Sequence, residues 1–543
     1  MGVPKIAVLS SSQDLGSSNY DGLILLFTDV KKLSPEVLAF DFSATVASYA
    51  KADKHAGSNI SFIADSKAPG GRIILAPTGS LFADTDDVRK IGETTLKAVQ
   101  RARQAGATSP LIHFVDPPKG HPEYKRYLEV TLLGALEACY EYLELREHRE
   151  KIGQVSPEDI TELGILANDV DNSLLEGIIK KVTAIEQGRR LCRDVGSPDP
   201  ERMAPLKFAE YVKESLAGAK NTTLTIIKDL DTLKKEYPLL HAVSRCSVDV
   251  ERHRPCVVRI EYKSPEPSKV KENLYFVGKG VTYDTGGADL KINGAMRGMS
   301  RDKLGAATVA GFMKTVAEQQ PTHVNIVADL GMVRNSIGSD AYLSDEVIYS
   351  RAGVRVLVGN TDAEGRMVMT DLLCHMRERV LKAREGGDKT PARLLTVATL
   401  TGHAIRAVGP YTCTLDNGPA RKDKISTRIF NAGAEWADPC EISTLRREDM
   451  SIVSSCSSRE DVIQSNDKPS TMTNRGHQLP VAFMIVASGL DKHGLDAESN
   501  QQISYTHLDI AGSALEPPRG ISISNVTARP IPSLVAAFLE ESL

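Results

Sequence analysis

The sequence predicts an α/β protein with two domains joined by a helical connector. Strand and helix signals alternate over the first part of the chain, a cluster of glycine and proline breaks the chain just before residue 201, and short apolar strands alternate with helices from there onward. The length of 543 residues allows each domain its own core. We expect an N-terminal α/β domain at 1–175, a helical connector at 176–200 and a larger mixed-sheet α/β domain at 201–543.

The N-terminal part contains the signals of a βαβ unit. Residues 73–76 and 111–115 read as buried strands, and residues 88–105 between them have helical spacing. A parallel sheet covered by helices is therefore expected. We predict a long helix over 124–152 and a further helix over 173–193, which the segment G-S-P-D-P ends.

The C-terminal part contains a series of short apolar segments that alternate with helical patterns. Their composition is typical of buried strands in an α/β sheet. The predicted strands are VVRIEY, NLYFVG, HVNIVADLG, VRVLVG, LLTVATLTG and THLDIAG.

Charge and composition exclude several classes of protein. The 66 basic and 70 acidic residues give a net charge of −4, which argues against a broad nucleic-acid or polybasic membrane surface. No apolar run reaches the roughly 18–20 residues that a membrane span needs, and no secretory signal is visible. The 8 cysteines include no C-x-x-C pair, so reduced thiols are expected. We predict a cytoplasmic chain that binds neither nucleic acid nor membrane.

Three segments place acidic and basic residues near predicted strand ends. They are V-G-K-G-V-T-Y-D-T-G-G-A-D-L-K at 277–291, M-S-R-D-K-L-G-A-A at 299–307, which opens a helix, and G-N-T-D-A-E-G-R at 359–366. Open α/β sheets bind ligands beyond the carboxyl ends of their strands, where we expect the first and third segments to lie.

The acidic residues of these segments suit a pair of metal ions. Asp284, Asp302, Asp362 and Glu364 would repel one another without countercharge, and divalent cations bridged by carboxylates relieve that repulsion. On extended backbone, Asp362 and Glu364 would point to the same side. The alternative is a set of strand-end turns with solvated carboxylates.

The segment N-T-D-A-E-G-R resembles the signature of the leucine aminopeptidase (cytosol aminopeptidase) family of two-metal exopeptidases. The segments V-G-K-G-V-T-Y-D-T-G-G, M-S-R-D-K-L-G-A-A, A-T-L-T-G and T-H-L-D-I-A-G are similar to that family in the same order. The resemblance covers the chain from about residue 186 onward. It implies a catalytic dimetal peptidase domain, preceded by a macro-domain-like α/β domain that serves regulation or oligomerisation.

The resemblance implies a role for each matching charged residue. Lys279, Asp284, Asp302 and Glu364 would hold the tightly bound metal, and Asp284, Asp362 and Glu364 the exchangeable one. The implied ions are Zn²⁺, with Mn²⁺, Mg²⁺ or Co²⁺ as alternatives in the exchangeable site.

Two further residues match the catalytic positions of the family that are not ligands. Lys291 would stabilise the oxyanion that forms when a metal-bridging hydroxide attacks the peptide carbonyl, and Arg366 would hold a bicarbonate that shuttles the proton. The positions that match the family's substrate cleft are Met299, Asn360, Ala363, Thr399, Leu400 and Gly402.

The implied function is a metal-dependent aminopeptidase that releases leucine and similar residues from short peptides, assembled as a homo-hexamer. The alternative is a family member with weak catalysis that serves as a structural or binding protein. Asp289, Leu304 and His403 differ from the residues usual in the family, and their effect on activity and on the preferred N-terminal residue stays open.

Overall fold

The computed structural model describes residues 2–9, 15, 19–38, 40–167, 170–466, 468–517 and 522–540. The chain divides into an N-terminal unit, Met1–Gln187 with Ala434–Asp438, and a C-terminal unit, Gly188–Gly433 with Pro439–Leu543. Helix α6 (Asn172–Gly196) contains the division between them. The boundary therefore falls inside the segment that the sequence predicts as a helical connector.

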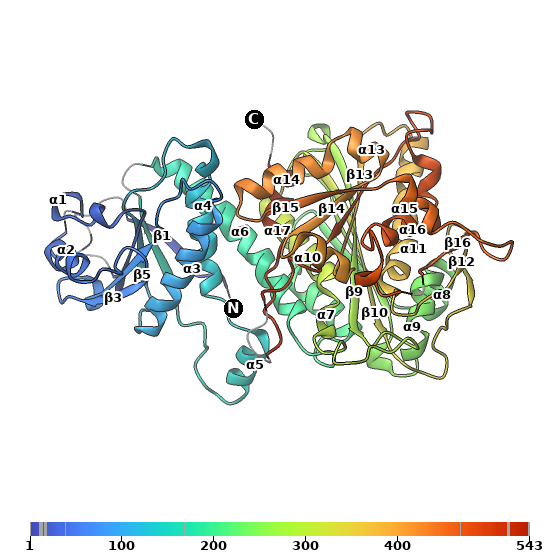
Figure 1. The fold of residues 1–543 in the computed structure, drawn as a ribbon, viewed down its shortest axis with the longest axis horizontal. Helices are drawn as coiled ribbons and strands as arrows, with labels where there is room; N and C mark the ends of the chain where they lie inside the picture. Colours follow the sequence, from blue (N-terminus) through green and yellow to red (C-terminus); the bar gives the residue numbers. More distant parts are fainter. Residues whose placement is uncertain are drawn as a thin grey trace. The chain divides into compact units, whose positions relative to one another are not determined.

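The N-terminal unit is a mixed sheet with helices on both faces (Figure 1). Its strands follow the order β1-β6-β5-β2-β4-β3, and all pairs are parallel except that of β3 with β4. Its elements are β1 (Lys5–Leu9), β2 (Gly22–Phe27), α1 (Pro35–Leu38), α2 (Ser43–Ala52), β3 (Ser61–Ala64), β4 (Arg72–Pro77), α3 (Arg89–Gln104), β5 (Pro110–Phe114), α4 (Tyr127–Ala138), α5 (Leu143–Lys151) and β6 (Glu162–Leu166).

Strand β2 lies at the centre of this sheet, between β4 and β5. Its sequence G-L-I-L-L-F is buried throughout, as expected of a parallel strand that helices cover on both faces. Leu23 and Leu25 belong to one apolar cluster with Phe42 and Val46 of the α2 region, because alternate residues of a strand face the same side.

The predicted helix over 124–152 is wrong, because the chain breaks it into α4 and α5. Between them, the backbone N–H of Glu141 donates to the carboxylate of Glu158 at 3.2 Å, and the carboxylate of Glu141 pairs with Arg103 at 2.9 Å. These contacts over a long sequence distance stabilise the break, and helical spacing alone does not reveal them.

The C-terminal unit contains the elements α7 (Pro205–Ser215), β7 (Thr222–Ile227), α8 (Leu230–Glu236), α9 (Pro238–Ser244), β8 (Cys256–Tyr262), β9 (Glu272–Asp284), α10 (Leu304–Gln319), β10 (Val324–Asn335), β11 (Val347–Tyr349), β12 (Arg355–Leu357), α11 (Glu364–Glu385), β13 (Ala392–Ala398), α12 (Gly402–Val408), β14 (Thr412–Asp416), α13 (Gly418–Lys422), α14 (Ile425–Glu435), β15 (Cys440–Thr444), α15 (Arg447–Ile452), β16 (Val462–Ile463), α16 (Leu479–Ala487), β17 (Ser504–Asp509) and α17 (Ile531–Phe538). Its main sheet has the order β15-β14-β17-β13-β9-β10-β8-β7. The four central strands, β17, β13, β9 and β10, run parallel, so their carboxyl ends meet at one edge.

Each of the six predicted strands overlaps a strand of the structure, β8, β9, β10, β12, β13 and β17. One of these strands lies in a different sheet from the one expected. Strand β12, which precedes the N-T-D-A-E-G-R segment, belongs to a separate sheet with the order β11-β12-β16 and not to the main sheet. The acidic segment therefore reaches the carboxyl edge of the main sheet from outside it.

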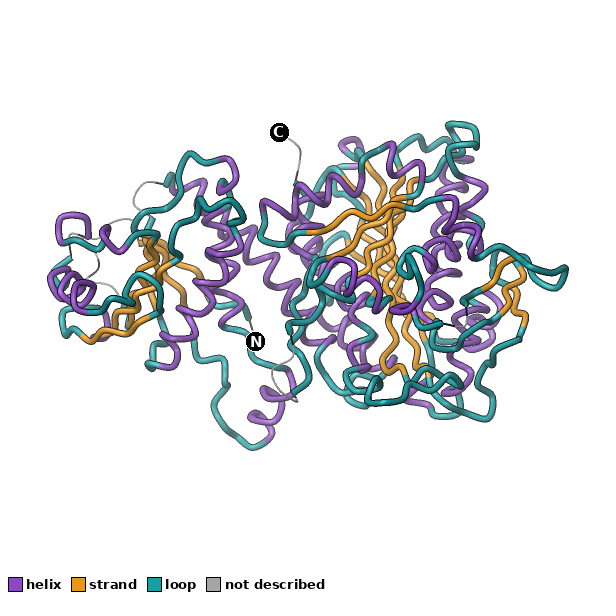
Figure 2. Tube along the Cα trace, viewed as in Figure 1, coloured by secondary structure: helices purple, strands orange, loops and turns teal. Residues whose placement is uncertain are grey.

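Helices cover the main sheet on both faces, as Figure 2 shows for the purple helices around the orange strands. On one face, the apolar side chains of β9 pack in a cluster with those of α9, α11 and α16. On the other face, Phe276 of β9 contacts Phe312 of α10 with ring centroids 4.8 Å apart. The rigid sheet between these layers carries the residues described below.

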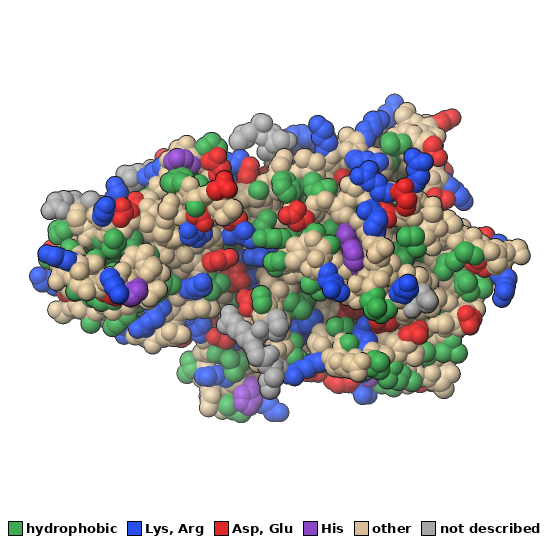
Figure 3. Space-filling model, in the orientation of Figure 1, with side chains coloured by type: hydrophobic (Ala, Val, Ile, Leu, Met, Phe, Trp, Pro, Cys, Tyr) green, Lys and Arg blue, Asp and Glu red, His purple; other side chains and the backbone are tan. Residues whose placement is uncertain are grey.

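Among the described residues, no helix is long and apolar enough to cross a membrane. On the face shown in Figure 3, basic and acidic side chains are interspersed, in keeping with the net charge of −4.

Candidate active site

Strand β9 carries two of the predicted site residues within the strand rather than after it. Lys279 lies on the face of β9 that also carries Val277 and Val281. Val281 pairs with Val333, whereas Asp284 pairs with Asn335, so β9 contains one extra residue at this point. This bulge shifts the alternation by one and directs Asp284 to the same side as Lys279.

The buried amine of Lys279 lies between two carboxylates. Its Nζ is 2.8 Å from Asp302 Oδ1 and 2.8 Å from Glu364 Oε1. Gly365 allows this approach, because a Cβ there would lie 2.7 Å from Lys279 Nζ. Burial alone would lower the pKa of Lys279, but the charges of Asp302 and Glu364 outweigh burial and leave the pKa raised. Ligation of a metal by this amine therefore requires the loss of a proton.

Three buried carboxylates converge beside this lysine. Asp284, Asp302 and Glu364 each offer an oxygen within 4.8 Å of the other two. Asp302 Oδ2 is buried without a hydrogen-bond partner among the described residues, and Lys279 is the cation beside Glu364 Oε1. Buried oxygens are rarely left in this state, and oxygen-rich clusters with one amine suit divalent cations, so the residues fit the predicted metal pair.

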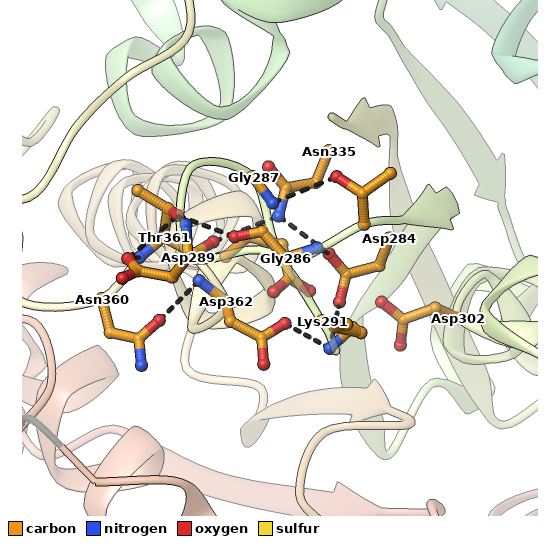
Figure 4. Close-up of polar contacts among 12 residues, drawn as sticks. Asp284, Gly286, Gly287, Asp289, Lys291, Asp302, Asn335, Asn360, Thr361 and Asp362 are labelled. Carbon is orange, nitrogen blue, oxygen red and sulfur yellow. Dashed lines mark hydrogen bonds and ion pairs between the residues drawn. The ribbon is translucent and has the colours of Figure 1, made fainter. Parts of the chain in front are cut away.

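The second lysine of the site, Lys291, joins Asp284 to a further carboxylate, that of Asp362 (Figure 4). Lys291 Nζ lies 2.9 Å from Asp284 Oδ2 and also contacts Asp362 Oδ1. The side-chain amide of Asn335 donates to Asp284 Oδ1 at 2.8 Å and fixes that carboxylate from the neighbouring strand β10. Burial opposes the charge on Lys291, but Asp284 and Glu364 outweigh it and raise the pKa of Lys291, which stays charged.

Asp362 and Glu364 converge by a different geometry from the predicted extended backbone. Asp362 lies in a turn, and Glu364 is the first residue of α11, whose N-terminus favours negative charge. The turn and the helix start bring the two carboxylates together, so the extended-strand prediction is wrong. Burial and the neighbouring Asp284 raise the pKa of Asp362 to about 7, which reflects crowded carboxylates without metal.

Arg366 lies in the first turn of α11 and is buried. Its Nη1 donates to the carbonyl of Gln464 at 2.8 Å, whereas its Nε has no hydrogen-bond partner among the described residues. Burial lowers the pKa of Arg366 to about 10, so the group remains a cation at neutral pH. A guanidinium with a spare buried donor is suited to a small anion such as bicarbonate.

The thirteen residues that the sequence singles out surround one cavity of about 450 Å³. They are Lys279, Asp284, Lys291, Asp302, Asp362, Glu364 and Arg366, with Met299, Asn360, Ala363, Thr399, Leu400 and Gly402. Thr399, Leu400 and Gly402 come directly after β13, and Met299 opens the short 3₁₀ turn before Asp302.

None of the three residues that depart from the usual family pattern lines the cavity. Asp289 Oδ2 accepts the backbone N–H of Thr361 at 2.7 Å. Leu304 is buried and packs where Gly196 leaves space, since a Cβ at Gly196 would lie 2.4 Å from it. His403 stacks on His477 and lies outside the cavity lining.

Sequence reasoning missed four residues that hold the site in place. Asn335 orients Asp284, and Asp509 at the end of β17 accepts hydrogen bonds from Leu400 N at 3.2 Å and Thr401 Oγ1 at 2.7 Å. Thr361 and Gln464 fix the turn that carries Asp362. Asp509 lies in the recognised segment T-H-L-D-I-A-G, which signals its place, whereas nothing in the sequence around Asn335 and Gln464 marks them.

A pair of histidines near the cavity, of which His477 is buried, predicts acid sensitivity. His403 Nδ1 lies 2.7 Å from His477 Nδ1, and burial with the neighbouring His403 lowers the pKa of His477 to about 4. Because the folded pKa is below the unfolded value of 6.5, His477 contributes its full stability above pH 6.5 and loses it progressively toward pH 4. We expect His477 to account for a loss of about 2 kcal/mol in the free energy of unfolding between pH 7.5 and pH 5.

Urea unfolding of the wild type and of His477→Gln at both pH values measures this contribution. The stability difference between the two pH values should be smaller by about 2 kcal/mol in the variant, since other groups titrate alike in both proteins. An equal difference in both proteins would contradict the contribution of His477.

The fold and the cavity together define an α/β protein with a carboxylate-rich site suited to divalent cations. Residues 190–535 match the sequence model described as the cytosol aminopeptidase family, catalytic domain. The chain is 40% identical over 475 residues to the Caenorhabditis elegans protein named "Putative aminopeptidase W07G4.4", which covers 87% of this chain and 86% of that protein. The chain belongs to the cytosol aminopeptidase family.

Solved structures share the fold. The apo structure of leucyl aminopeptidase from Trypanosoma cruzi has a TM-score of 0.77 at 18% identity, over 99% of this chain and 97% of that one. The bottromycin maturation enzyme BotP in complex with Mn has a TM-score of 0.72 at 18% identity, over 95% and 98% of the two chains. Membership of the family supports an aminopeptidase function, hence a hydrolase, and does not favour a role in binding alone.

Proposed function

We propose that this chain is a two-metal aminopeptidase that removes the N-terminal residue, leucine or a similar one, from short peptides. The observation that carries the proposal is the buried cluster of Asp284, Asp302 and Glu364, in which Asp302 Oδ2 lacks a hydrogen-bond partner among the described residues. The cluster faces a cavity of about 450 Å³, large enough for a few residues of a peptide.

The proposed ligands are Lys279, Asp284, Asp302 and Glu364 for one ion, and Asp284, Asp362 and Glu364 for the other. Zn²⁺ is the proposed ion, with Mn²⁺, Mg²⁺ or Co²⁺ possible in the second position, and the Mn complex of BotP supports a divalent ion in this fold. When bound, the ions would anchor the free α-amine, polarise the scissile carbonyl and activate water.

The side chains of the chain itself supply the remaining chemistry. The charged Nζ of Lys291 stabilises negative charge on the carbonyl oxygen of the substrate, a contribution commonly worth about 3–4 kcal/mol. Arg366 is proposed to hold bicarbonate through its spare Nε, and bicarbonate bound there would supply the proton transfer from the attacking water to the departing amine. Met299, Leu400 and Gly402 belong to the proposed walls for the peptide.

The requirement for a free amine tests the exopeptidase proposal. We expect the purified protein to hydrolyse leucine amide and a leucyl dipeptide, and to leave N-acetyl-leucine amide intact, because acetylation removes the basic amine that anchors the substrate. Cleavage of the acetylated compound at a similar rate would contradict an aminopeptidase. No cleavage of any of the three would favour the alternative of a catalytically weak binding protein.

Assembly and location complete the proposal. We propose a cytoplasmic homo-hexamer that admits only short peptides, on the basis of family membership. Light scattering should give a mass close to six times the 58.9 kDa of one chain. A mass near that of one chain would contradict the hexamer.

A further inference from the structure

The turn at 359–363 carries Asp362 and leads directly into Glu364 and Arg366, so its conformation sets the place of three proposed functional groups. A turn of this kind has backbone N–H and C=O groups that no helix or strand satisfies. The side chains that bond these groups therefore decide how firmly the turn is held.

Gln464 bonds this turn from the segment after β16. Its Oε1 accepts the N–H groups of Gly359 and Asn360, both at 3.0 Å. Its Nε2 donates to the carbonyls of Asn360 at 2.8 Å and Ala363 at 2.9 Å. All four hydrogen-bonding positions of the amide are thus used on a single turn, and the side chain is fully buried.

The backbone of Gln464 extends the same contacts to the helix. Its carbonyl accepts Arg366 Nη1 at 2.8 Å, and its N–H donates to Leu357 O, also at 2.8 Å, at the end of β12. One residue therefore links the strand before the turn, the turn itself and the guanidinium after it.

We propose that Gln464 is a positioning residue, which holds the turn at 359–363 and thereby places the carboxylate of Asp362 for the second metal ion. The inference rests on the proposed metal pair. Asp289 supports the turn from the other side, where its carboxylate accepts Thr361 N (Figure 4). Gln464 does not itself line the cavity, so its effect on the metal site is exerted through the residues that it holds.

The decisive measurement is Mn²⁺ binding to the full-length, metal-free protein by calorimetry. Gln464→Glu keeps the size of the side chain and the oxygen that accepts from Gly359 and Asn360, but replaces the donor with an oxygen that faces the carbonyls of Asn360 and Ala363. We expect affinity for the more weakly bound Mn²⁺ ion to fall about 10–100-fold, as is typical when a residue that supports a ligand is changed. The first ion, held largely by Lys279 and Asp302, should lose less.

The matched control is Gln502→Leu, since the amide of Gln502 likewise donates to two backbone carbonyls, those of Leu495 and Ala497. The control should bind both Mn²⁺ ions like the wild type. Gln464→Leu, which removes all four bonds, should lose at least as much affinity as Gln464→Glu.

The outcomes separate this inference from the proposed function. Wild-type affinity for both ions in Gln464→Glu would overturn the positioning role alone. Circular dichroism shows whether Gln464→Glu folds. If this variant does not fold, Gln464 is a residue that the core requires, and the positioning role is overturned as well. A wild type that binds no Mn²⁺ would refute the proposed metal pair, and the inference would fall with it.

Discussion

Replacement of Asp362 by alanine should reduce the turnover of leucine amide about 100-fold or more while the protein stays folded. Asp362 is a proposed ligand of the second ion, and loss of that ion removes half of the two-metal site. Its side chain is 35% exposed and lies in a turn, so truncation opens no cavity in the core. Burial and Asp284 raise its pKa to about 7, so removal of this carboxylate also relieves repulsion in the metal-free site.

Steady-state kinetics and metal content by mass spectrometry test this expectation together. The matched control is Asp423→Ala, because Asp423 is 34% exposed and also forms an ion pair, with Arg393 at 2.6 Å. The control should keep wild-type turnover and both ions. Turnover of Asp362→Ala within about tenfold of the wild type would show that the assigned role is wrong.

Replacement of Lys291 by methionine should lower kcat about 100- to 1,000-fold with little change in KM. Lys291 is proposed to contribute a charge that acts on the developing oxyanion, and removal of one such donor commonly has this effect. The neighbouring carboxylates keep Lys291 charged, and methionine preserves most of the length of the side chain. Since lysine at this position is not a proposed ligand, both metal ions should be retained.

Lys314→Met is the control for this substitution. Lys314 forms an ion pair with Glu318 at 2.7 Å on α10, three helical turns beyond the start of that helix. The kcat of Lys314→Met should equal that of the wild type. A fall in metal content for Lys291→Met would instead assign Lys291 to metal binding, and an unchanged kcat would remove it from the mechanism.

The sequence predicts six strands of the C-terminal unit, because each contains a short apolar run and the burial that selects such runs is local information. The bulge in β9 is not predictable in this way, since the extra residue at 282–284 is defined only by pairing with β10. Likewise, V-R-V-L-V reads as a buried strand, but its membership of the small sheet depends on a partner more than 100 residues away, Val462.

The charged residues of the site could be found from the sequence, because carboxylates and lysines that cluster near strand ends indicate metal chemistry. The residues that hold them in place could not. Asn335 and Gln464 are neutral amides whose importance lies in the geometry of their partners, and those partners are distant in sequence. A lone amide carries no chemical signal until its contacts are known.

The central claim is that two metal ions in this cavity make the chain an aminopeptidase. The most direct test is hydrolysis of leucine amide by protein stripped with a chelator and then reconstituted with Zn²⁺ or Mn²⁺. We predict that the stripped protein is inactive and that activity returns as two ions bind per chain. Full activity in the stripped protein, or no activity with two ions bound, would contradict the claim.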